Sequence, residues 1–541
     1  MLSHSVISTA GKAQTKNNRG RCKPALLKKE NQVNLTEEQK AIVEHDNNLR
    51  INAFAGTGKT TTLLEYSKRR PNSRILYIAF NRSVKEEAIK KFHKEGLNNV
   101  TIETAHSLAY KATGAKKYKI SSGLRTFDIA DILGLKPKLS DNLYHLILAK
   151  HIIKLLAYFC NSNVQTLKDL DYLETINDKS AYSFAKGNIE KIENCTLELI
   201  NKMYRKEIEI IHDFYLKLYQ LSNPHLNYDY ILFDEGQDAS PVMLDVFLKQ
   251  SARKIIVGDE HQQIYGFRYA VNSLEKVNFD KLYLTNSFRF RQDIANLAMV
   301  VLYFKKCLGC KVNGAKIIGA GNPTTEKSHA VLARSNIGLL DRAIEEVFFN
   351  RVKKVYFEGN INSYTFASDG ASIYDVLNLY LNQRNKIRNS FIKCFNSFED
   401  LEKYIKDTED VELDLIASIV KKYGVYLFTY LPGLKKYQVK KEEAQITFST
   451  VHKSKGMEYD LVELADDFIT EEAVNKIADD LQSLEKLGIE GIKEEINILY
   501  VAMTRAKNKL YVPRSLFKKA SEILKQSRLV KKMKEVRGVN R

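Results

Sequence analysis

A glycine-rich segment near the start of the chain has the residues needed to hold a phosphate chain. It reads Ala53-Phe-Ala-Gly-Thr-Gly-Lys-Thr60, and it lies between a predicted strand and a predicted helix. Its glycines let backbone amides curl around phosphates, while Lys59 reaches the outer phosphates and the Thr60 hydroxyl holds Mg²⁺. The segment therefore predicts ATP and Mg²⁺ as cofactors. Its predicted nucleotide-binding residues are Gly56, Thr57, Gly58, Lys59 and Thr60, together with Thr61 directly after the segment.

A second segment supplies the carboxylates that ATP hydrolysis needs. The run Tyr228-Asp-Tyr-Ile-Leu-Phe-Asp-Glu235 reads as a buried strand that ends in two acids. Asp234 is the predicted magnesium ligand, and Glu235 is the predicted general base that takes a proton from the attacking water. Two solvated acids at the end of a strand are the simpler alternative. Because the pair follows a phosphate loop, we favour an ATPase site.

The elements that must position these residues alternate between strand and helix. Strand patterns occur at residues 49–53, 75–80, 228–233, 254–257 and 281–284, and again at 330–333 and 446–449. Between them, residues 111–223 show apolar side chains at helical spacing, which indicates a helical insertion. The predicted fold class is α/β, with two α/β domains that bracket inserted segments.

Composition limits the kinds of protein that the chain can be. The formal net charge is +19, but the tails supply most of it, because residues 1–30 hold seven basic side chains and one acidic, and residues 513–541 hold ten and two. Charge alone therefore leaves a nucleic-acid partner open. No apolar run approaches the ~20 residues of a membrane span. The expectation is a soluble, intracellular protein without a membrane partner.

Cysteine use points to a reducing compartment and away from structural zinc. The six cysteines are scattered, and Cys307 and Cys310 form a single CxxC without a second pair of ligands nearby. A structural zinc site normally needs four ligands. We therefore expect ordinary reduced thiols.

Seven segments, in order along the chain, resemble the motifs of the UvrD/Rep family of superfamily 1 helicases. The plainest is Val257–Ala270, which reads VGDEHQQIYGFRYA and is similar to motif III. The amino-acid sequences of several motifs are most similar to those of the F-box DNA helicase branch, although no F-box pattern is evident. The other segments are Leu35–Gln39, Ile78–Asn81, Thr104–Ser107, Leu284–Arg289, Thr450–Glu458 and Leu499–Ala506.

The resemblance implies two RecA-like P-loop motor domains with parallel sheets, each carrying a largely helical insertion. Residues 33–110 and 224–285 are expected to form the first motor domain, and 286–336 and 446–515 the second. The expected insertions are 111–223 and a small accessory segment, 337–445. A basic disordered arm, 1–32, and a basic C-terminal helix and tail, 516–541, complete the prediction.

The resemblance also implies roles for single residues. Arg289 and Arg505 would approach the γ-phosphate, and Gln262 would link that phosphate to the DNA-contacting groups. Gln39 would read adenine, Phe288 would stack on the base and Glu458 would contact the ribose. The predicted catalytic residues are Lys59, Glu235, Gln262, Arg289 and Arg505. The predicted DNA-binding residues are Phe80, Asn81, His106, Tyr265, Phe267, His452 and Lys453.

The activity implied by the resemblance is ATP-dependent DNA unwinding with 3′ to 5′ movement on single-stranded DNA, in recombination, repair or replication-fork processing. Single-stranded DNA and its junctions with duplex are the expected partners. The alternative is a translocase that strips bound proteins, such as recombinase filaments, with little unwinding. An RNA substrate and a non-catalytic DNA-binding factor stay open as weaker readings. The expected location is the nucleus of a eukaryotic cell, or the cytoplasm and nucleoid of a bacterium.

Overall fold

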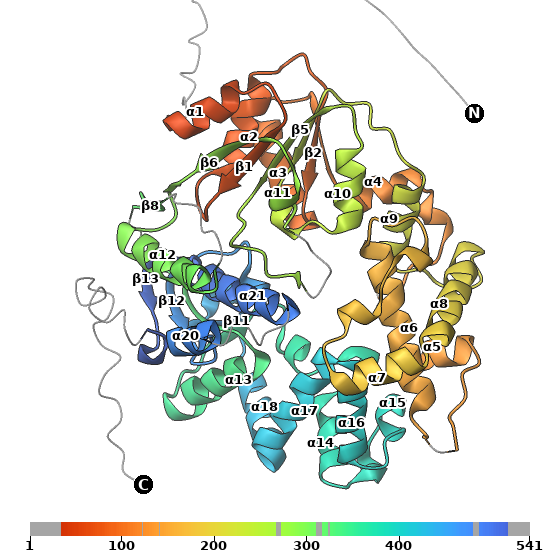
Figure 1. Ribbon diagram of the computed structural model, residues 1–541. Coiled ribbons are helices and arrows are strands. Elements are labelled where there is room, and N and C mark those ends of the chain that lie inside the picture. The colour runs from red at the N-terminus through yellow and green to blue at the C-terminus, as the bar shows by residue number, and fades with distance from the viewer. Residues whose placement is uncertain are drawn as a thin grey trace, which may run out of the picture.

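The computed structural model describes residues 34–517, except 122, 140, 267–271, 310–315, 323–324 and 480–485. Two parallel sheets lie one above the other at one side of the molecule, and helices extend from both at the other side (Figure 1). The predicted class, α/β with parallel sheets and helical insertions, is confirmed. The predicted arm 1–32 and most of the predicted tail 516–541 lie outside the described residues.

The first sheet carries the phosphate loop, and its four central strands are largely buried. Such strands read as continuous apolar runs because helices cover both sides of a parallel sheet. We call this sheet and its helices the first lobe. Its strand order is β3-β2-β4-β5-β1-β6, with bounds β1 Leu49–Ala53, β2 Ile75–Ala79, β3 Val100–Thr104, β4 Tyr230–Phe233, β5 Arg253–Gly258 and β6 Asp280–Leu284. Its helices are α1 Glu37–Glu44, α2 Lys59–Lys68, α3 Arg82–Lys94, α10 Pro241–Leu248 and α11 Ser273–Lys276.

The second sheet, which with its helices we call the second lobe, has the order β10-β11-β9-β12-β13. Its strands are β9 His329–Ala333, β10 Val355–Phe357, β11 Ile446–Thr450, β12 Tyr459–Leu464 and β13 Ala506–Tyr511. Its helices are α12 Gln292–Cys307, α13 Asn336–Ile344, α19 Val451–Ser454, α20 Glu471–Asp479 and α21 Lys486–Met503, and a short pair, β7 Asn286–Ser287 with β8 Ile318–Gly319, precedes it. Leu516 and Phe517, at the start of the predicted tail, pack into its core.

One predicted boundary differs from the structure. The accessory segment was expected to begin at residue 337, but β10 pairs with β11 inside the second sheet, and α13 contacts β9 and β11. The second lobe therefore includes the beginning of that segment. The reason is length, because β10 has three residues and an apolar run that marks a buried strand needs about four or more.

The two helical insertions pack on each other and share one apolar core. The first contains α4 Ala105–Ala112, α5 Thr126–Ile132, α6 Tyr144–Asn161, α7 Lys179–Gly187, α8 Ile189–Tyr204 and α9 His212–Leu221; the second contains α14 Ile373–Tyr380, α15 Ser390–Lys393, α16 Phe398–Thr408, α17 Val411–Tyr423 and α18 Leu427–Lys436. Buried polar contacts join them. Lys150 pairs with Asp410 at 2.6 Å, and the His151 ring donates to the Asp407 carbonyl at 3.0 Å. Figure 1 shows the two groups side by side.

Acid should destabilise this helical contact through His151. The ring is buried, and burial lowers its pKa to about 4. Between about pH 6.5 and pH 4 the unfolded chain therefore binds a proton that the folded chain does not, so stability falls as the pH falls through this window. For α6 amides we expect the free energy of opening, measured by hydrogen exchange, to drop by about 2 kcal/mol from pH 7 to pH 5. In His151→Gln, which keeps a donor and an acceptor, the free energy of opening should not fall between pH 7 and pH 5. An equal decrease in this variant would contradict the assignment to His151.

None of the helices in the described part of the chain is long and apolar enough to cross a membrane. The described cysteines, Cys160, Cys195, Cys307 and Cys394, are free thiols. Cys310, the other half of the CxxC, lies outside the described residues.

Candidate functional site

The phosphate loop joins the end of β1 to the start of α2. Gly56 and Gly58 have φ of +74° and +80°, a left-handed conformation that favours glycine. A Cβ on Gly56 would lie 2.5 Å from Arg289 Cβ, so glycine is also needed for close approach. The loop is bonded to the chain that follows β6, since the Ser287 hydroxyl donates to the Ala55 carbonyl at 2.7 Å and the Phe288 amide to the Gly56 carbonyl at 2.9 Å. Thr57 closes the loop by donating to the Phe54 carbonyl at 2.9 Å.

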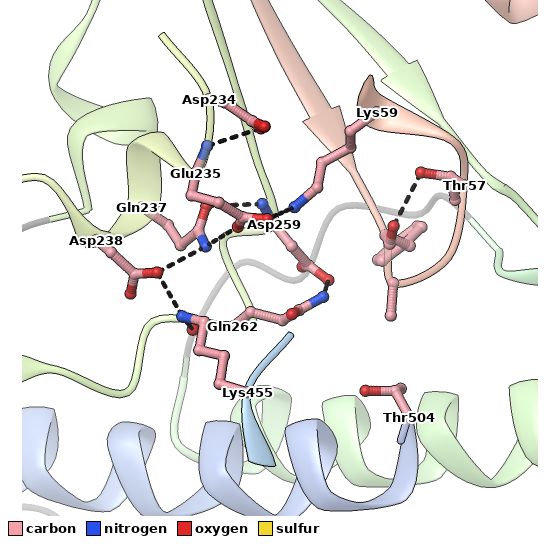
Figure 2. Close-up of polar contacts among 12 residues, drawn as sticks. Thr57, Lys59, Asp234, Glu235, Gln237, Asp238, Asp259, Gln262, Lys455 and Thr504 are labelled. Atoms are coloured by element: carbon pink, nitrogen blue, oxygen red, sulfur yellow. Dashed lines mark hydrogen bonds and ion pairs between the residues drawn. The ribbon is translucent and has the colours of Figure 1, made fainter. Parts of the chain in front are cut away.

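The two predicted acids lie at the carboxyl end of β4, directly opposite the loop. Lys59 Nζ pairs with Glu235 Oε1 at 2.7 Å, and both side chains are largely buried (Figure 2). Burial and the neighbouring Glu235 charge raise the pKa of Asp234. Burial would also raise the pKa of Glu235, but the charges of Lys59 and Lys455 outweigh it and lower that pKa. The Lys59 ammonium thus favours the ionised form of Glu235, which is the form that the predicted general base requires.

The surroundings of Asp234 fit a magnesium ion. The Tyr77 hydroxyl donates to Asp234 Oδ2 and also interacts with the Thr60 side chain, so the two predicted ligands share one neighbour. Asp234 and Glu235 are adjacent buried carboxyls, and the charge of each makes ionisation of the other less favourable. A divalent cation would bind well beside such a pair. Magnesium is usually held by one or two protein oxygens together with substrate phosphates. Thr60 and Asp234 would supply the protein's share.

The second lobe presents two arginines to the same place. Arg289 donates to Glu458 Oε1 from Nε at 2.8 Å and from Nη2 at 2.7 Å, and from Nη1 to the Thr504 carbonyl at 3.0 Å. Arg505 is fully buried and donates to Gln262 Oε1 at 3.3 Å. Burial and the charge of Arg289 lower the pKa of Arg505 to about 9, which leaves it protonated at neutral pH. Predicted catalytic residues from both lobes thus meet at the interface between the lobes, which we call the cleft.

Gln262 occupies the centre of this cleft. Its amide nitrogen donates to Asp259 Oδ2 at 2.7 Å, and the Tyr500 hydroxyl donates to the same oxygen at 3.0 Å. Tyr500 comes from α21 of the second lobe, so Asp259 and Gln262 are held by both lobes. The position suits the predicted link between the γ-phosphate and the rest of the cleft.

The residues predicted for adenine lie beside Gly58. A Cβ there would be 3.1 Å from Gln39 Nε2 and 3.9 Å from the Phe288 ring. Phe288 is 51% exposed, as expected of a ring that stacks on a bound base. The Gln39 side chain is buried and already bonded, because Oε1 accepts from the Thr36 amide at 3.0 Å and Nε2 donates to Thr62 at 3.2 Å. Thr61 is half-buried at the start of α2.

Three of the rings predicted to line the strand form a row that both lobes build. Phe80 stacks on Tyr265 with centroids 5.8 Å apart and an interplanar angle of 21°, and Tyr265 lies 6.0 Å from His452. The Tyr265 hydroxyl donates to the His452 carbonyl at 3.2 Å, and the His452 ring donates to the Ile264 carbonyl at 3.0 Å. We call Phe80, Tyr265 and His452 the ring ladder.

Three of the other predicted strand contacts have partners outside the ring ladder. Lys453 lies over the Tyr364 ring at 3.4 Å, and burial lowers its pKa to about 8. Asn81 caps α3 by accepting from the Val84 amide at 2.9 Å. His106 pairs with Asp213 of α9 at 3.1 Å. Phe267 lies outside the described residues.

Comparison with known proteins gives the family. Residues 35–280 match the family model of the UvrD/REP helicase N-terminal domain. F-box DNA helicase 1 of Gallus gallus is 31% identical over 515 residues, which cover 90% of this chain and 49% of that protein. Residues 35–280 therefore belong to the UvrD/REP helicase family. The predicted resemblance is confirmed.

Two further relatives extend the comparison. F-box DNA helicase protein 1 of Schizosaccharomyces pombe is 33% identical over 529 residues, 89% of the chain and 57% of the relative. A probable DNA helicase II homologue of Mycoplasma genitalium is 25% identical over 311 residues, 50% of the chain and 42% of the relative. The chain thus spans about half the length of the curated relatives it matches.

Several residues in this UvrD/REP site were not among those predicted from the sequence: Tyr77, Gln237, Asp238, Asp259, Lys455 and Tyr500. Lys455 and Tyr500 lie inside the quoted family motifs, and Asp238 lies three residues after Glu235. Each contacts a predicted residue or another member of this group. Membership of a motif, which Asp259 shares with Lys455 and Tyr500, and proximity in sequence to a predicted acid were the available signals, and neither specifies a role.

Removing the middle ring of the ring ladder should weaken strand binding. Stacking of one base on an aromatic side chain contributes ~1–3 kcal/mol, so Tyr265→Ala should raise the Kd for labelled oligo(dT) about 10-fold. Fluorescence anisotropy without nucleotide measures this Kd. Phe288→Ala is the matched control, because that ring faces the phosphate loop and should raise the KM for ATP while leaving the Kd unchanged. Equal Kd values for wild type and Tyr265→Ala would contradict the assignment of the ring ladder to the strand.

Proposed function

We propose that this chain is an ATP-dependent DNA helicase that moves 3′ to 5′ along single-stranded DNA. The observation that carries the proposal is one cleft built by both lobes. On one side of it, Lys59, Asp234 and Glu235 face Arg289 and Arg505. On the other, the ring ladder also draws its members from both lobes. Movement of one lobe relative to the other would therefore change the nucleotide site and the ring ladder together.

The hydrolytic step follows from the charges in the cleft. Glu235, ionised before nucleotide binds, would accept a proton from the attacking water. When nucleotide binds, the Lys59 ammonium would leave Glu235 and bind phosphate oxygens instead. Glu235 would then be able to accept the proton. Arg289 and Arg505 would stabilise the charge that develops on the transferred phosphoryl group. A bound magnesium ion would neutralise part of the triphosphate charge.

Strand movement would follow from closure of the cleft. Phe80 and Tyr265 belong to the first lobe, whereas His452 follows β11 of the second lobe. When nucleotide binding or release moves one lobe relative to the other, the spacing within the ring ladder would change. Stacking tolerates any base, so such a change would advance the strand without regard to sequence.

The proposed partners are single-stranded DNA and its junctions with duplex. The names of the relatives, which call them DNA helicases, support DNA over RNA. Recombination, repair and replication-fork processing are the settings in which such junctions arise, and they would place the protein with chromosomal DNA, in the nucleus of a eukaryotic cell.

Tailed duplexes test the proposal and its alternative. With ATP and Mg²⁺, we expect unwinding of a duplex with a 3′ single-stranded tail and none of one with a 5′ tail; Glu235→Gln should unwind neither. Unwinding from the 5′ tail alone would contradict the polarity. Displacement of streptavidin from a biotinylated single strand without duplex unwinding would favour the alternative, a translocase that removes bound proteins such as recombinase filaments.

A further inference from the structure

Two short segments bring positive charges together at one edge of the second lobe. Residues 349–354 precede β10, and residues 435–440 include the end of α18 and the chain after it; together they contain six basic residues and no acidic one. The segments lie side by side, because the Val355 amide donates to the Tyr437 carbonyl at 3.0 Å and the Val439 amide donates to the Val355 carbonyl at 2.9 Å. The chain after α18 thus runs along the edge of β10.

The cations on these segments are available to a ligand. Five of them are exposed and form no ion pair with another described residue: Arg351, Lys353, Lys354, Lys435 and Lys436. Lys353 instead donates to the Tyr437 hydroxyl at 3.1 Å and lies 4.4 Å from the centroid of that ring. This hydrogen bond and the charges of Lys353 and Lys436 lower the pKa of Tyr437. The potential at this surface is therefore positive, as a polyanion requires.

Exposed aromatic rings lie beside these cations. Phe349 is 70% exposed, and Tyr426, directly before α18, is 64% exposed. The neighbouring Phe348 packs on Gly433 of α18 and lies 5.1 Å from the Tyr430 ring. Tyr430 in turn stacks on Tyr426, with ring centroids 6.2 Å apart. We call this surface the outer strip and define it by six residues: Phe349, Arg351, Lys354, Tyr426, Lys435 and Lys436.

The outer strip is remote from the ring ladder. Lys354 precedes β10, whose first residue pairs with Ile446 at the start of the parallel strand β11, whereas His452 follows the end of β11. The five residues of β11 span about 16 Å. Figure 1 shows α18 at the end of the molecule away from the first lobe. The lysines that precede β10 are therefore at the opposite edge of the second sheet from the cleft.

Exposed rings among unpaired cations suit a single nucleic-acid strand. Cations neutralise phosphates, and a ring stacks on a base of any kind. A duplex keeps its bases stacked inside, so it would leave the ring of Phe349 without a partner. An acidic protein segment would match the charges, but a single strand offers both phosphates and unstacked bases. The composition of the outer strip therefore favours single-stranded DNA.

We propose that the outer strip binds the displaced strand, the strand that the cleft does not hold during unwinding. The inference rests on the proposed function, because unwinding leaves one strand in the cleft and releases the other. The released strand is then the single strand that a surface outside the cleft can meet. Its retention there would keep the two strands apart without any contact to the nucleotide.

A forked duplex measures this contact directly. The Kd is determined for a duplex with a 3′ tail alone and for the same duplex with an added 5′ arm of about 20 thymidines, longer than the ~4–16 nucleotides of one single-strand site. The ratio of the two Kd values is the gain from the arm. We expect a gain of about 10-fold for the wild type and of less than about 2-fold for the triple variant Lys354→Gln, Lys435→Gln, Lys436→Gln. The Kd for the duplex with the 3′ tail alone should change less than about 3-fold.

Salt dependence and a neutral substitution separate the two kinds of contact. A single strand contributes a slope of about −0.7 per neutralised phosphate to log K against log salt, so the triple variant should reduce the slope for the forked duplex by about 2. Phe349→Ala removes a ring and no charge. It should lower the gain about 3-fold, because one stacked base is lost, and leave the slope unchanged.

Two control variants test whether the effect belongs to the outer strip. Lys90→Gln, Lys91→Gln, Lys94→Gln removes the same total charge from exposed positions of α3 in the first lobe, and it should keep the wild-type gain. Tyr265→Ala weakens the ring ladder and should raise both Kd values equally, so its gain should also match the wild type.

The outcomes separate the inference from the proposed function. If the wild type unwinds the 3′-tailed duplex but gains no affinity from the 5′ arm, or if the triple variant keeps the full gain, the inference is overturned and the proposed function stands. An equal gain from a double-stranded arm would assign the outer strip to duplex and overturn the inference as well. If the wild type hydrolyses no ATP and binds no 3′-tailed duplex, the proposed function fails, and the inference fails with it. A gain lost in the triple variant and kept in the α3 control supports the inference.

Discussion

Lys59→Ala is expected to lower kcat for ATP hydrolysis by about 100- to 1,000-fold, the usual cost of losing one group that stabilises transition-state charge. Lys59 opens α2 and lies 2.7 Å from Glu235, so it is within reach of the loop that would hold the phosphates. Steady-state hydrolysis in the presence of single-stranded DNA measures the effect.

Lys68→Ala is the matched control for this prediction. Lys68 ends the same helix and makes its ion pairs with Glu65 and Glu95, on the outer surface of the first lobe. Its loss should leave kcat within about 2-fold, because partly exposed ion pairs contribute little. If Lys59→Ala kept more than about a tenth of the wild-type kcat, the assigned phosphate loop would be wrong.

Glu235→Gln is expected to lower kcat about 100- to 10,000-fold while nucleotide binding is retained, because general-base catalysis commonly contributes that much. The substitution keeps the size of the side chain and removes the carboxylate that pairs with Lys59. Single-turnover hydrolysis and equilibrium binding of a fluorescent ATP analogue measure the two effects separately.

Loss of nucleotide binding together with hydrolysis would show that Glu235 serves the site through its pairing with Lys59 rather than as a base. Glu65→Gln, which alters another lysine partner on the outer side of α2, should change neither quantity. If Glu235→Gln hydrolysed ATP at a near-normal rate, the general base would have to be another carboxylate of the cleft.

Much of the first lobe could be predicted from local sequence. The strand that ends at Ala53, the glycines of the loop and the two acids after β4 each give a short-range signal, and the structure brings them together because parallel strands end at one edge of a sheet. Glycines at positive φ and a strand of continuous apolar residues need no tertiary information to be noticed.

The remaining features depend on contacts between distant residues. Lys455 and Asp238 are 217 positions apart, and nothing near either one marks it as a partner of the other. The same holds for Lys150 and Asp410, which join the two helical insertions. Gln39 shows a different limit of prediction from sequence. Its side chain caps α1, a role that the family resemblance does not imply.

The most direct test of the account is the rate of ATP hydrolysis with and without single-stranded DNA, with poly-U RNA as the comparison. The account predicts a rate that single-stranded DNA stimulates strongly, that RNA stimulates less, and that both Lys59→Ala and Glu235→Gln abolish. A wild type that hydrolyses no ATP, or one that RNA stimulates better than DNA, would contradict it.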